Sequence, residues 1–230
     1  TRLAKVHKGE RLVDARFWQA EALRQLGKYP DAILLYDEII NKFAGHPLVI
    51  DAWLRKGDCE FWLKRYEEAI DNWEEATKLE PEFAIPWRNL GFAYFNIHQD
   101  GEKARRSYAR AFELNPNDPR FLYELDLIMQ RTGEAPADRL ARLEENMELV
   151  DARDALYVTR CALYNQIGEP QRALDLVLNR NFHPWEGGEG KVSAQFVYSV
   201  TQLARRDLEN GRYDEALERL RTTEVWPRSI

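Results

Sequence analysis

Histidine side chains are the first candidates for chemistry in this chain, because they serve as acid–base groups and metal ligands near neutral pH. The sequence has four of them, His7, His46, His98 and His183. None has a second histidine, a cysteine or a carboxylate at metal-ligand spacing on the same helix face. We therefore expect no metal site. Only His183 has unusual neighbours, since Phe182 and Trp185 flank it.

A glycine-rich run is the second candidate, because glycine amides before a helix can cradle a phosphate. The run is Gly187-Gly188-Glu189-Gly190-Lys191. A P-loop also needs a glycine at the start of the motif and Ser or Thr after the Gly-Lys pair. Trp185 and Val192 occupy those positions. We interpret the run as a loop that caps and redirects the next helix.

Carboxylates are abundant, but none is marked for catalysis. The chain has 39 Asp and Glu residues, and no pair stands out as buried and held in contrasting environments, as acid–base catalysis requires. The Gly-x-Ser-x-Gly elbow of serine hydrolases and the His-Glu-x-x-His zinc helix are also missing from the sequence. We expect a protein without enzymatic activity and without a cofactor.

The elements that position these residues follow an internal repeat. Residues 50–83 form a 34-residue stretch that predicts two helices joined by a tight turn, and it recurs at offsets of 34 or 35 residues. Self-similarity at this period is typical of helical repeat proteins. The recurring positions are Trp53, Gly57, Ala69, Trp73, Ala76 and Pro81, followed by Trp87, Gly91, Ala104, Tyr108, Ala111 and Pro116.

Steric reasons explain the residue types in the repeat. A small residue such as Gly57 or Gly91 lets two helix axes approach closely, while a large aromatic side chain fills the space beside it. Pro81 and Pro116 end each second helix, because proline cannot donate to the preceding turn and disfavours helical geometry just before itself.

The order of a bulky residue, a small residue, Tyr, Ala, an aromatic residue, Ala and Pro resembles the tetratricopeptide repeat (TPR) family. That resemblance implies an all-α, right-handed helical solenoid, and we expect about six helix-turn-helix pairs in one domain. Residues 1–8 are expected to end an upstream helix that Gly9 breaks. The predicted pairs lie at about residues 10–47, 50–83, 84–118, 119–152, 154–181 and 192–226.

The fourth pair departs from the pattern, because Asp138 replaces the usual small residue. An apolar stripe at helical spacing still predicts a second helix through residue 150. The stripe consists of Leu140, Leu143, Met147 and Val150.

An insertion separates the fifth and sixth pairs. The turn glycines Gly168 and Gly211 are 43 residues apart, nine more than one repeat, and residues 182–190 account for the surplus. We expect this loop to fold onto the repeats. Its sequence, His-Pro-Trp-Glu-Gly-Gly-Glu-Gly-Lys, resembles the C-terminal repeat region of large bacterial proteins of unknown function. The resemblance implies a preceding mutarotase-like β-sandwich domain and a bacterial, cytoplasmic, carbohydrate-related context.

In TPR-like stacks the first helix of each pair lines a groove, and counting repeat positions gives candidate binding residues. The result is an aromatic groove edged with arginines, and exposed aromatics beside Arg are typical anchors for peptides. The alternative is that Phe61, Trp62, Phe92 and Phe95 pack against the following helix or another chain. The groove candidates are Leu54, Asp58, Phe61, Trp62, Arg88, Phe92, Phe95, Asn96, Tyr123, Leu127, Gln130 and Arg131, and the loop candidates are Phe182, His183, Trp185 and Glu186.

Two charged residues occupy repeat positions that are normally apolar. Lys56 and Glu60 are four residues apart on one helix face, and an unpaired buried charge is costly. We expect an exposed helix pair, with a polar pocket between the first two repeats as the alternative.

Composition limits the partners. The net charge of −6 and pI near 5.4 argue against nucleic acid or an anionic membrane as general partners. Cys59 and Cys161 are too far apart in the predicted array for a disulfide. The chain starts without Met, which we interpret as a fragment of a longer protein.

We expect a scaffold that binds a protein or peptide in its groove, the partner including another domain of the same protein. The alternatives are a protein that binds or acts on carbohydrate directly through the aromatic residues, and a self-assembly module.

Overall fold

The computed structural model describes the backbone of residues 2–183 and 189–224, and side chains from residue 11 onward within those ranges except that of Glu189. The described residues form helices, turns and short connections, without β-strands. The predicted all-α fold is confirmed. By its internal contacts the chain divides into two compact units, residues 1–115 and residues 116–230.

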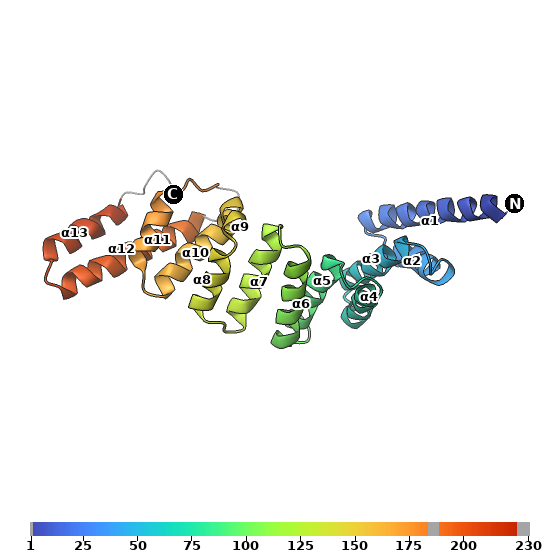
Figure 1. Ribbon diagram of the computed structural model, residues 1–230, viewed down its shortest axis with the longest axis horizontal. Helices are drawn as coiled ribbons and strands as arrows, with labels where there is room; N and C mark the ends of the chain where they lie inside the picture. The colour runs from blue at the N-terminus through green and yellow to red at the C-terminus, as the bar shows by residue number, and fades with distance from the viewer. Residues whose placement is uncertain (1, 184–188, 225–230) are drawn as a thin grey trace. The chain divides into compact units, whose positions relative to one another are not determined.

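The first unit consists of three helical hairpins (blue to green in Figure 1). Their helices pack on their neighbours in sequence, and the apolar core runs from Val13 and Phe17 in α1 to Ala52 and Cys59 in α3. The helices are α1 (Arg2–Gln25), α2 (Tyr29–Lys42), α3 (Leu48–Trp62), α4 (Tyr66–Leu79), α5 (Ala84–Asn96) and α6 (Gly101–Leu114).

Two helical glycines explain how closely these hairpins pack. A Cβ atom added to Gly57 would lie 2.6 Å from the Trp73 ring, and one added to Gly91 would lie 2.7 Å from the Tyr108 ring. Such distances are far below van der Waals contact, so only glycine fits. The predicted pairing of a small residue with a large aromatic one is therefore confirmed in both copies.

The second unit also consists of hairpins (green to red in Figure 1), with α12 longer than the other described helices of this unit. The turn glycines Gly168 and Gly211 have φ values of +84° and +74°, a left-handed conformation that favours glycine. The helices are α7 (Pro119–Arg131), α8 (Pro136–Glu144), α9 (Met147–Ala152), α10 (Asp154–Gln166), α11 (Pro170–Leu178), α12 (Glu189–Glu209), α13 (Tyr213–Arg221) and the short 3-10 helix η2 (Thr222–Glu224).

Two sequence expectations about helix continuity are wrong. Gly9 does not break a helix, because α1 continues through it to Gln25. The second helix of the fourth pair is split into α8 and α9. The split lies at Asn146, whose side-chain amide donates to the Arg142 carbonyl at 2.8 Å. Asparagine competes for backbone groups in this way and so favours helix ends.

The expected exposed pair of Lys56 with Glu60 is also wrong. Lys56 instead forms an ion pair with Asp37 of α2 at 2.8 Å. Glu60 is buried and pairs with Arg65 at 3.2 Å. Each charge therefore finds its partner outside α3, so the i,i+4 spacing within the helix was misleading.

Both cysteines are buried and unpaired. Within the described residues, no helix combines the length and apolar character needed to cross a bilayer.

Candidate functional site

A polar pocket of about 190 Å³ lies among the first helices of the three hairpins in the second unit. The helices α7, α10 and α12 each contribute side chains three or four residues apart, and this spacing places the side chains of each helix on one face of that helix. The residues lining this polar pocket are Tyr123, Asp126, Leu127, Gln130, Arg139, Val158, Thr159, Ala162, Leu163, Gln166, Lys191 and Gln195.

An ion pair forms the base of the polar pocket. Arg139 of α8 donates from Nε and one terminal nitrogen to the two carboxylate oxygens of Asp126 in α7, at 3.0 and 2.6 Å. Arg139 is 2% exposed and Asp126 is 3% exposed. Because each charge is satisfied by the other, this pair gives the pocket a rigid wall and offers no unpaired acid or base.

Amide groups and one cation supply the accessible polarity. Gln130 is exposed and lies one turn beyond Leu127 on α7, and Gln166 ends α10. Gln195 accepts a hydrogen bond from Asn165 at 3.0 Å, which fixes its side chain. Lys191 is exposed and has no described carboxylate within ion-pair distance. Amides donate and accept hydrogen bonds, so the pocket suits a peptide backbone or side-chain amide with a nearby carboxylate.

A buried network behind Gln195 holds α10 and α12 in register. Asn165 donates to Gln195, and its carbonyl oxygen accepts from the Ser199 hydroxyl at 2.9 Å. The same hydroxyl lies 2.8 Å from the Gln195 backbone carbonyl, a second acceptor for its single proton. Since these polar groups are mutually satisfied, they position the pocket wall without competing for a ligand.

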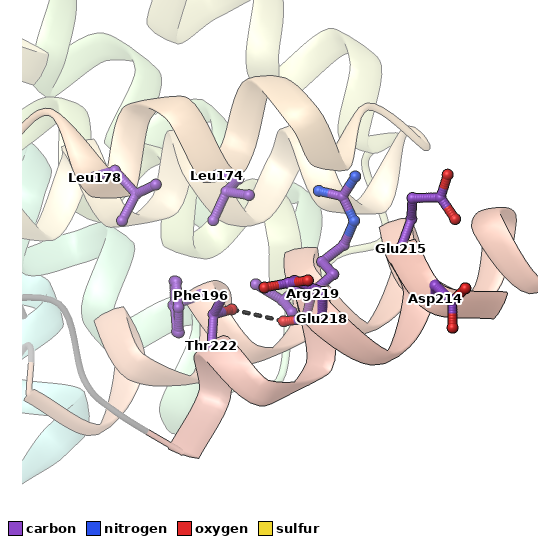
Figure 2. Close-up of a pocket in the computed structure, with 9 residues that line it drawn as sticks. Leu174, Leu178, Phe196, Asp214, Glu215, Glu218, Arg219 and Thr222 are labelled. Carbon is purple, nitrogen blue, oxygen red and sulfur yellow. Dashed lines mark hydrogen bonds between the residues drawn. The ribbon is translucent and has the colours of Figure 1, made fainter. Parts of the chain in front are cut away.

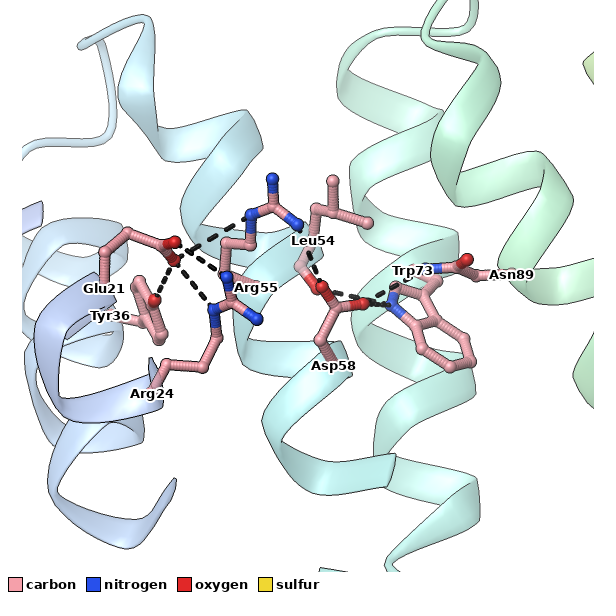
Figure 3. Close-up of polar contacts among 8 residues, drawn as sticks. All are labelled: Glu21, Arg24, Tyr36, Leu54, Arg55, Asp58, Trp73 and Asn89. Carbon is pink, nitrogen blue, oxygen red and sulfur yellow. Dashed lines mark hydrogen bonds and ion pairs between the residues drawn. The ribbon is translucent and has the colours of Figure 1, made fainter. Parts of the chain in front are cut away.

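The first unit has a different face on its own first helices. Figure 3 shows a chain of polar contacts that runs from Glu21 of α1 to Asn89 of α5. Arg24 donates to Glu21 at 2.8 Å, and Arg55 of α3 lies 3.8 Å from Glu21 and 3.2 Å from Asp58. The charges alternate along the chain, so most of this face is committed to holding the hairpins together.

Asp58 is the central group of this network. It accepts hydrogen bonds from the Trp73 indole at 3.2 Å and the Asn89 amide at 3.1 Å (Figure 3). Burial raises the pKa of Asp58, and the positive charge of Arg55 partly opposes that effect. At Glu21 the balance is reversed, because hydrogen bonds from Arg24 and Tyr36 outweigh burial and lower its pKa. Both carboxylates act as structural acceptors between helices.

The sequence-predicted groove residues of α3 do not share one environment. Leu54 is 1% exposed and belongs to the core, so its side chain is not available to a ligand. Phe61 is half-buried against Tyr66 and Trp73 of α4, with ring centroids 5.4 and 5.9 Å away. Trp62 is 63% exposed and stacks on Tyr29 at 6.4 Å. Of these residues, Leu54 and Phe61 pack within the repeats, whereas Trp62 stays largely exposed.

The predicted residues of α5 are more accessible. Phe92 is exposed and contacts Phe61 edge to face at 5.7 Å. Asn96 is exposed and donates to the Phe92 carbonyl at 2.8 Å. Arg88 and Phe95 are half-buried.

In the second unit, Tyr123 lies in the polar pocket, 5.2 Å from the Arg153 guanidinium, whereas Arg131 is exposed at the end of α7. Tyr123, Leu127 and Gln130 are thus brought together. Gln166, Lys191 and Gln195 were missed. Counting groove positions along the fifth repeat, as was done for the earlier ones, could have found Gln166. Lys191 precedes the predicted sixth pair at residues 192–226, and Gln195 falls between its counted positions.

The start of the predicted loop is held by Asp154, the first residue of α10. Asp154 accepts from the His183 backbone N–H at 2.7 Å and from Arg180 at 2.6 Å. The Arg180 guanidinium lies 4.3 Å from the Tyr157 ring centroid, and Phe182 packs edge to face on Tyr157. Phe182 and His183 are therefore anchored to the repeats. Trp185 and Glu186 lie outside the described residues.

No group of three or more His, Cys, Asp or Glu side chains that could hold a metal ion occurs in the described part of the chain. The arrangement of the polar pocket is suited to binding by hydrogen bonds and shape.

Two family models match the first part of the chain. One, described as tetratricopeptide repeat, matches residues 1–47, and the other, described as TPR repeat, matches residues 57–97. These two segments of the first unit match the TPR pattern. The second match includes both Gly57 and Gly91, the glycines of the close helix contacts, so it agrees with the repeat derived from residues 50–83.

The curated relatives include the Photosystem I assembly protein Ycf3. The chain is 35% identical over 71 residues to the protein of a Synechococcus strain and 38% identical over 74 residues to that of a Prochlorococcus marinus strain. Each match covers 30% of this chain and about two fifths of the relative, 40% and 42%. The likeness therefore covers a minority of each chain.

Solved structures extend the TPR fold over most of the chain. Naa15/Naa10 bound to HypK-THB matches with a TM-score of 0.63 and 19% identity, covering 91% of this chain and 31% of that one. YrrB, described as a TPR protein with an unusual peptide-binding site, matches with a TM-score of 0.57 and 14% identity, covering 84% and 93%. At these identities the similarity shows the fold alone, and it includes the second unit.

Proposed function

We propose that this chain is a non-enzymatic scaffold that binds a peptide segment of a partner protein in the polar pocket of the second unit. TPR proteins act as scaffolds for protein or peptide interactions. The observation that carries the proposal is the convergence of Gln130, Gln166 and Gln195, from three successive first helices, on one pocket. Three amides in one recess are suited to the repeating donors and acceptors of a peptide chain.

The charge of the pocket narrows the class of peptide. The Asp126–Arg139 pair is internally neutralised, so Lys191 supplies the uncompensated charge among the lining residues. A peptide with a carboxylate beside its amide-binding segment would gain a charge-assisted hydrogen bond to Lys191. We therefore expect selected peptides to be enriched in Asp or Glu at one position. The partner could equally be a segment of a separate protein or of another domain in the same polypeptide.

A library of random peptides displayed on phage tests the proposal. Selected peptides should bind the chain, and Gln166→Ala or Lys191→Gln should weaken binding by about tenfold, the effect of losing one good hydrogen bond at a well-packed site. Gln171→Ala is the matched control, because Gln171 is exposed on α11 and bonds only Asp175 among the described contacts. Selection of no peptide, or of peptides whose affinity the pocket variants leave unchanged, would contradict the proposal.

A further inference from the structure

A second recess lies on the second unit, between α11 and α13. Figure 2 shows Leu174 and Leu178 of α11 facing a row of charged side chains on α13. Its volume is about 730 Å³, roughly four times that of the polar pocket. We call it the acidic groove, and it is lined by Leu174, Leu178, Phe196, Val200, Asp214, Glu215, Glu218, Arg219 and Thr222.

The floor of the acidic groove is apolar. Leu174, Phe196 and Val200 are buried parts of the core. Leu178, the last residue of α11, remains 42% exposed at the edge of the floor. Leu178 continues the buried apolar surface, so covering it with an apolar side chain of a partner would favour binding.

The rim has a strongly one-sided charge. Asp214, Glu215 and Glu218 project from α13, and no described cation lies within ion-pair distance of any of them. Arg219, also in the lining, directs its Nε to Asp207 at 3.0 Å, so the rim holds three carboxylates against one arginine. Asp207, which is buried, also accepts from the exposed Arg212 at 2.6 Å. Among the described lining residues, the rim therefore has a net negative charge beside an apolar floor.

The dimensions favour a helical occupant. The helices α11 and α13 that border the groove each have nine residues, about 13 Å at the rise of an α-helix. An amphipathic helix laid in such a groove places apolar anchors at i, i+3, i+4 and i+7 on the floor. Lysine or arginine residues beside those anchors would then lie next to Asp214 and Glu218.

We propose that the acidic groove binds a basic amphipathic helix of a partner protein, with leucine-like side chains on Leu174 and Leu178 and basic side chains on the α13 rim. This surface is distinct from the polar pocket, which uses Lys191 and Gln195 on another face of α12. The two sites can therefore be tested separately.

The probe is a fluorophore-labelled synthetic amphipathic helical peptide made of Leu and Lys. The matched control peptide has Glu in place of each Lys. The Leu/Lys peptide should bind, with an affinity that falls as salt is raised, because surface charge attraction is screened. Equal binding of the Leu/Glu peptide, or no binding of the Leu/Lys peptide at low salt, would overturn the proposal.

Variants locate the binding. Asp214→Lys/Glu218→Lys should weaken the Leu/Lys peptide by at least about tenfold, and Leu178→Ser should weaken it by a similar factor because the floor loses its exposed anchor. Glu145→Lys/Glu148→Lys is the matched control, since it makes the same charge change at exposed positions outside the groove, just after α8 and in α9. Circular dichroism checks that each variant is folded. Equal weakening by the control pair would overturn the assignment to the groove.

Two other occupants give distinct results. If a second copy fills the groove, light scattering will show a dimer that Leu178→Ser dissociates. If the chain's own last residues fill it, the peptide will bind only to a variant that ends at Glu224. Either result overturns the proposal, whereas Gln166→Ala should leave peptide binding at the groove unchanged.

Discussion

Asp126 and Arg139 form a two-pronged ion pair across the α7–α8 hairpin, with the closer oxygen and nitrogen 2.6 Å apart and both side chains almost fully buried. The pair lies where the repeat pattern weakens, since Arg139 directly follows Asp138. Asp126→Ala should destabilise the protein by about 3–5 kcal/mol, because it leaves Arg139 charged and buried without a partner. Chemical denaturation measures this loss.

The double variant Asp126→Leu/Arg139→Met is the informative comparison. Replacing a buried ion pair by apolar side chains of similar size is often neutral or stabilising, so the double variant should be more stable than Asp126→Ala. If the double variant is less stable than Asp126→Ala, the Asp126–Arg139 ion pair contributes more to stability than apolar packing at the same positions, which would contradict this prediction.

Gly57 and Gly91 should not tolerate alanine. Alanine favours a helix over glycine by about 1 kcal/mol, but its Cβ would overlap the rings of Trp73 and Tyr108. Overpacking of this kind costs about 1–3 kcal/mol, so thermal or urea unfolding should show a net loss of stability. Gly45→Ala is the control, since an added Cβ meets nothing within 4 Å there. Stabilisation at Gly57 or Gly91 would mean that the helices do not approach this closely.

Asp154 should make the second unit acid-sensitive. Burial alone would raise the pKa of Asp154, but hydrogen bonds from the His183 backbone and from Arg180 outweigh burial and lower it. Because the pKa of Asp154 is lower in the folded state than in the unfolded state (about 3.9), the ionised carboxylate stabilises the folded state at any pH above about 3.9. This stabilisation is lost as the pH falls through the folded-state pKa. Asp154→Asn should therefore reduce stability near neutral pH by about 1–3 kcal/mol.

Urea unfolding of wild type and Asp154→Asn over a pH series checks this sign. The difference between them should shrink as pH falls below the unfolded pKa. Asp214→Asn is the control, because Asp214 lies on an exposed rim without a described hydrogen bond. A difference that grows in acid would contradict the assigned role of Asp154.

Both cysteines should be unreactive in the folded protein. Burial raises the pKa of Cys59 and of Cys161 to about 12, and the thiolate is the reactive form. A disulfide reagent at mildly alkaline pH should modify neither thiol quickly until denaturant is added, when both should react. Rapid labelling of either thiol in native buffer would show that its repeat opens locally.

The sequence could predict the repeat because its signals are local. Gly57, Trp73 and the residues one repeat later each report a contact inside a single hairpin, and the structure confirms those contacts. The groove was less predictable, because a repeat position indicates the helix face on which a side chain lies but does not indicate how exposed that side chain is. Leu54 and Trp62 were assigned to the same surface, yet Leu54 lies in the core and Trp62 is largely exposed.

Side-chain pairing over longer distances was beyond the sequence. Lys56 pairs with Asp37, and Glu60 pairs with Arg65. The spacing of Lys56 and Glu60 within α3 instead suggests that they pair with each other. The acidic groove was missed for a related reason. Asp214, Glu215 and Glu218 look like an ordinary solvated helix face until Leu174 and Leu178 are seen opposite them.

Hydrogen–deuterium exchange on the complex with a selected peptide tests the central proposal most directly. Bound peptide should slow exchange in α7, α10 and α12, whose side chains line the polar pocket, and Gln166→Ala should reduce this protection. Protection confined to α11 and α13, or to the first unit, would contradict the polar pocket as the peptide-binding site.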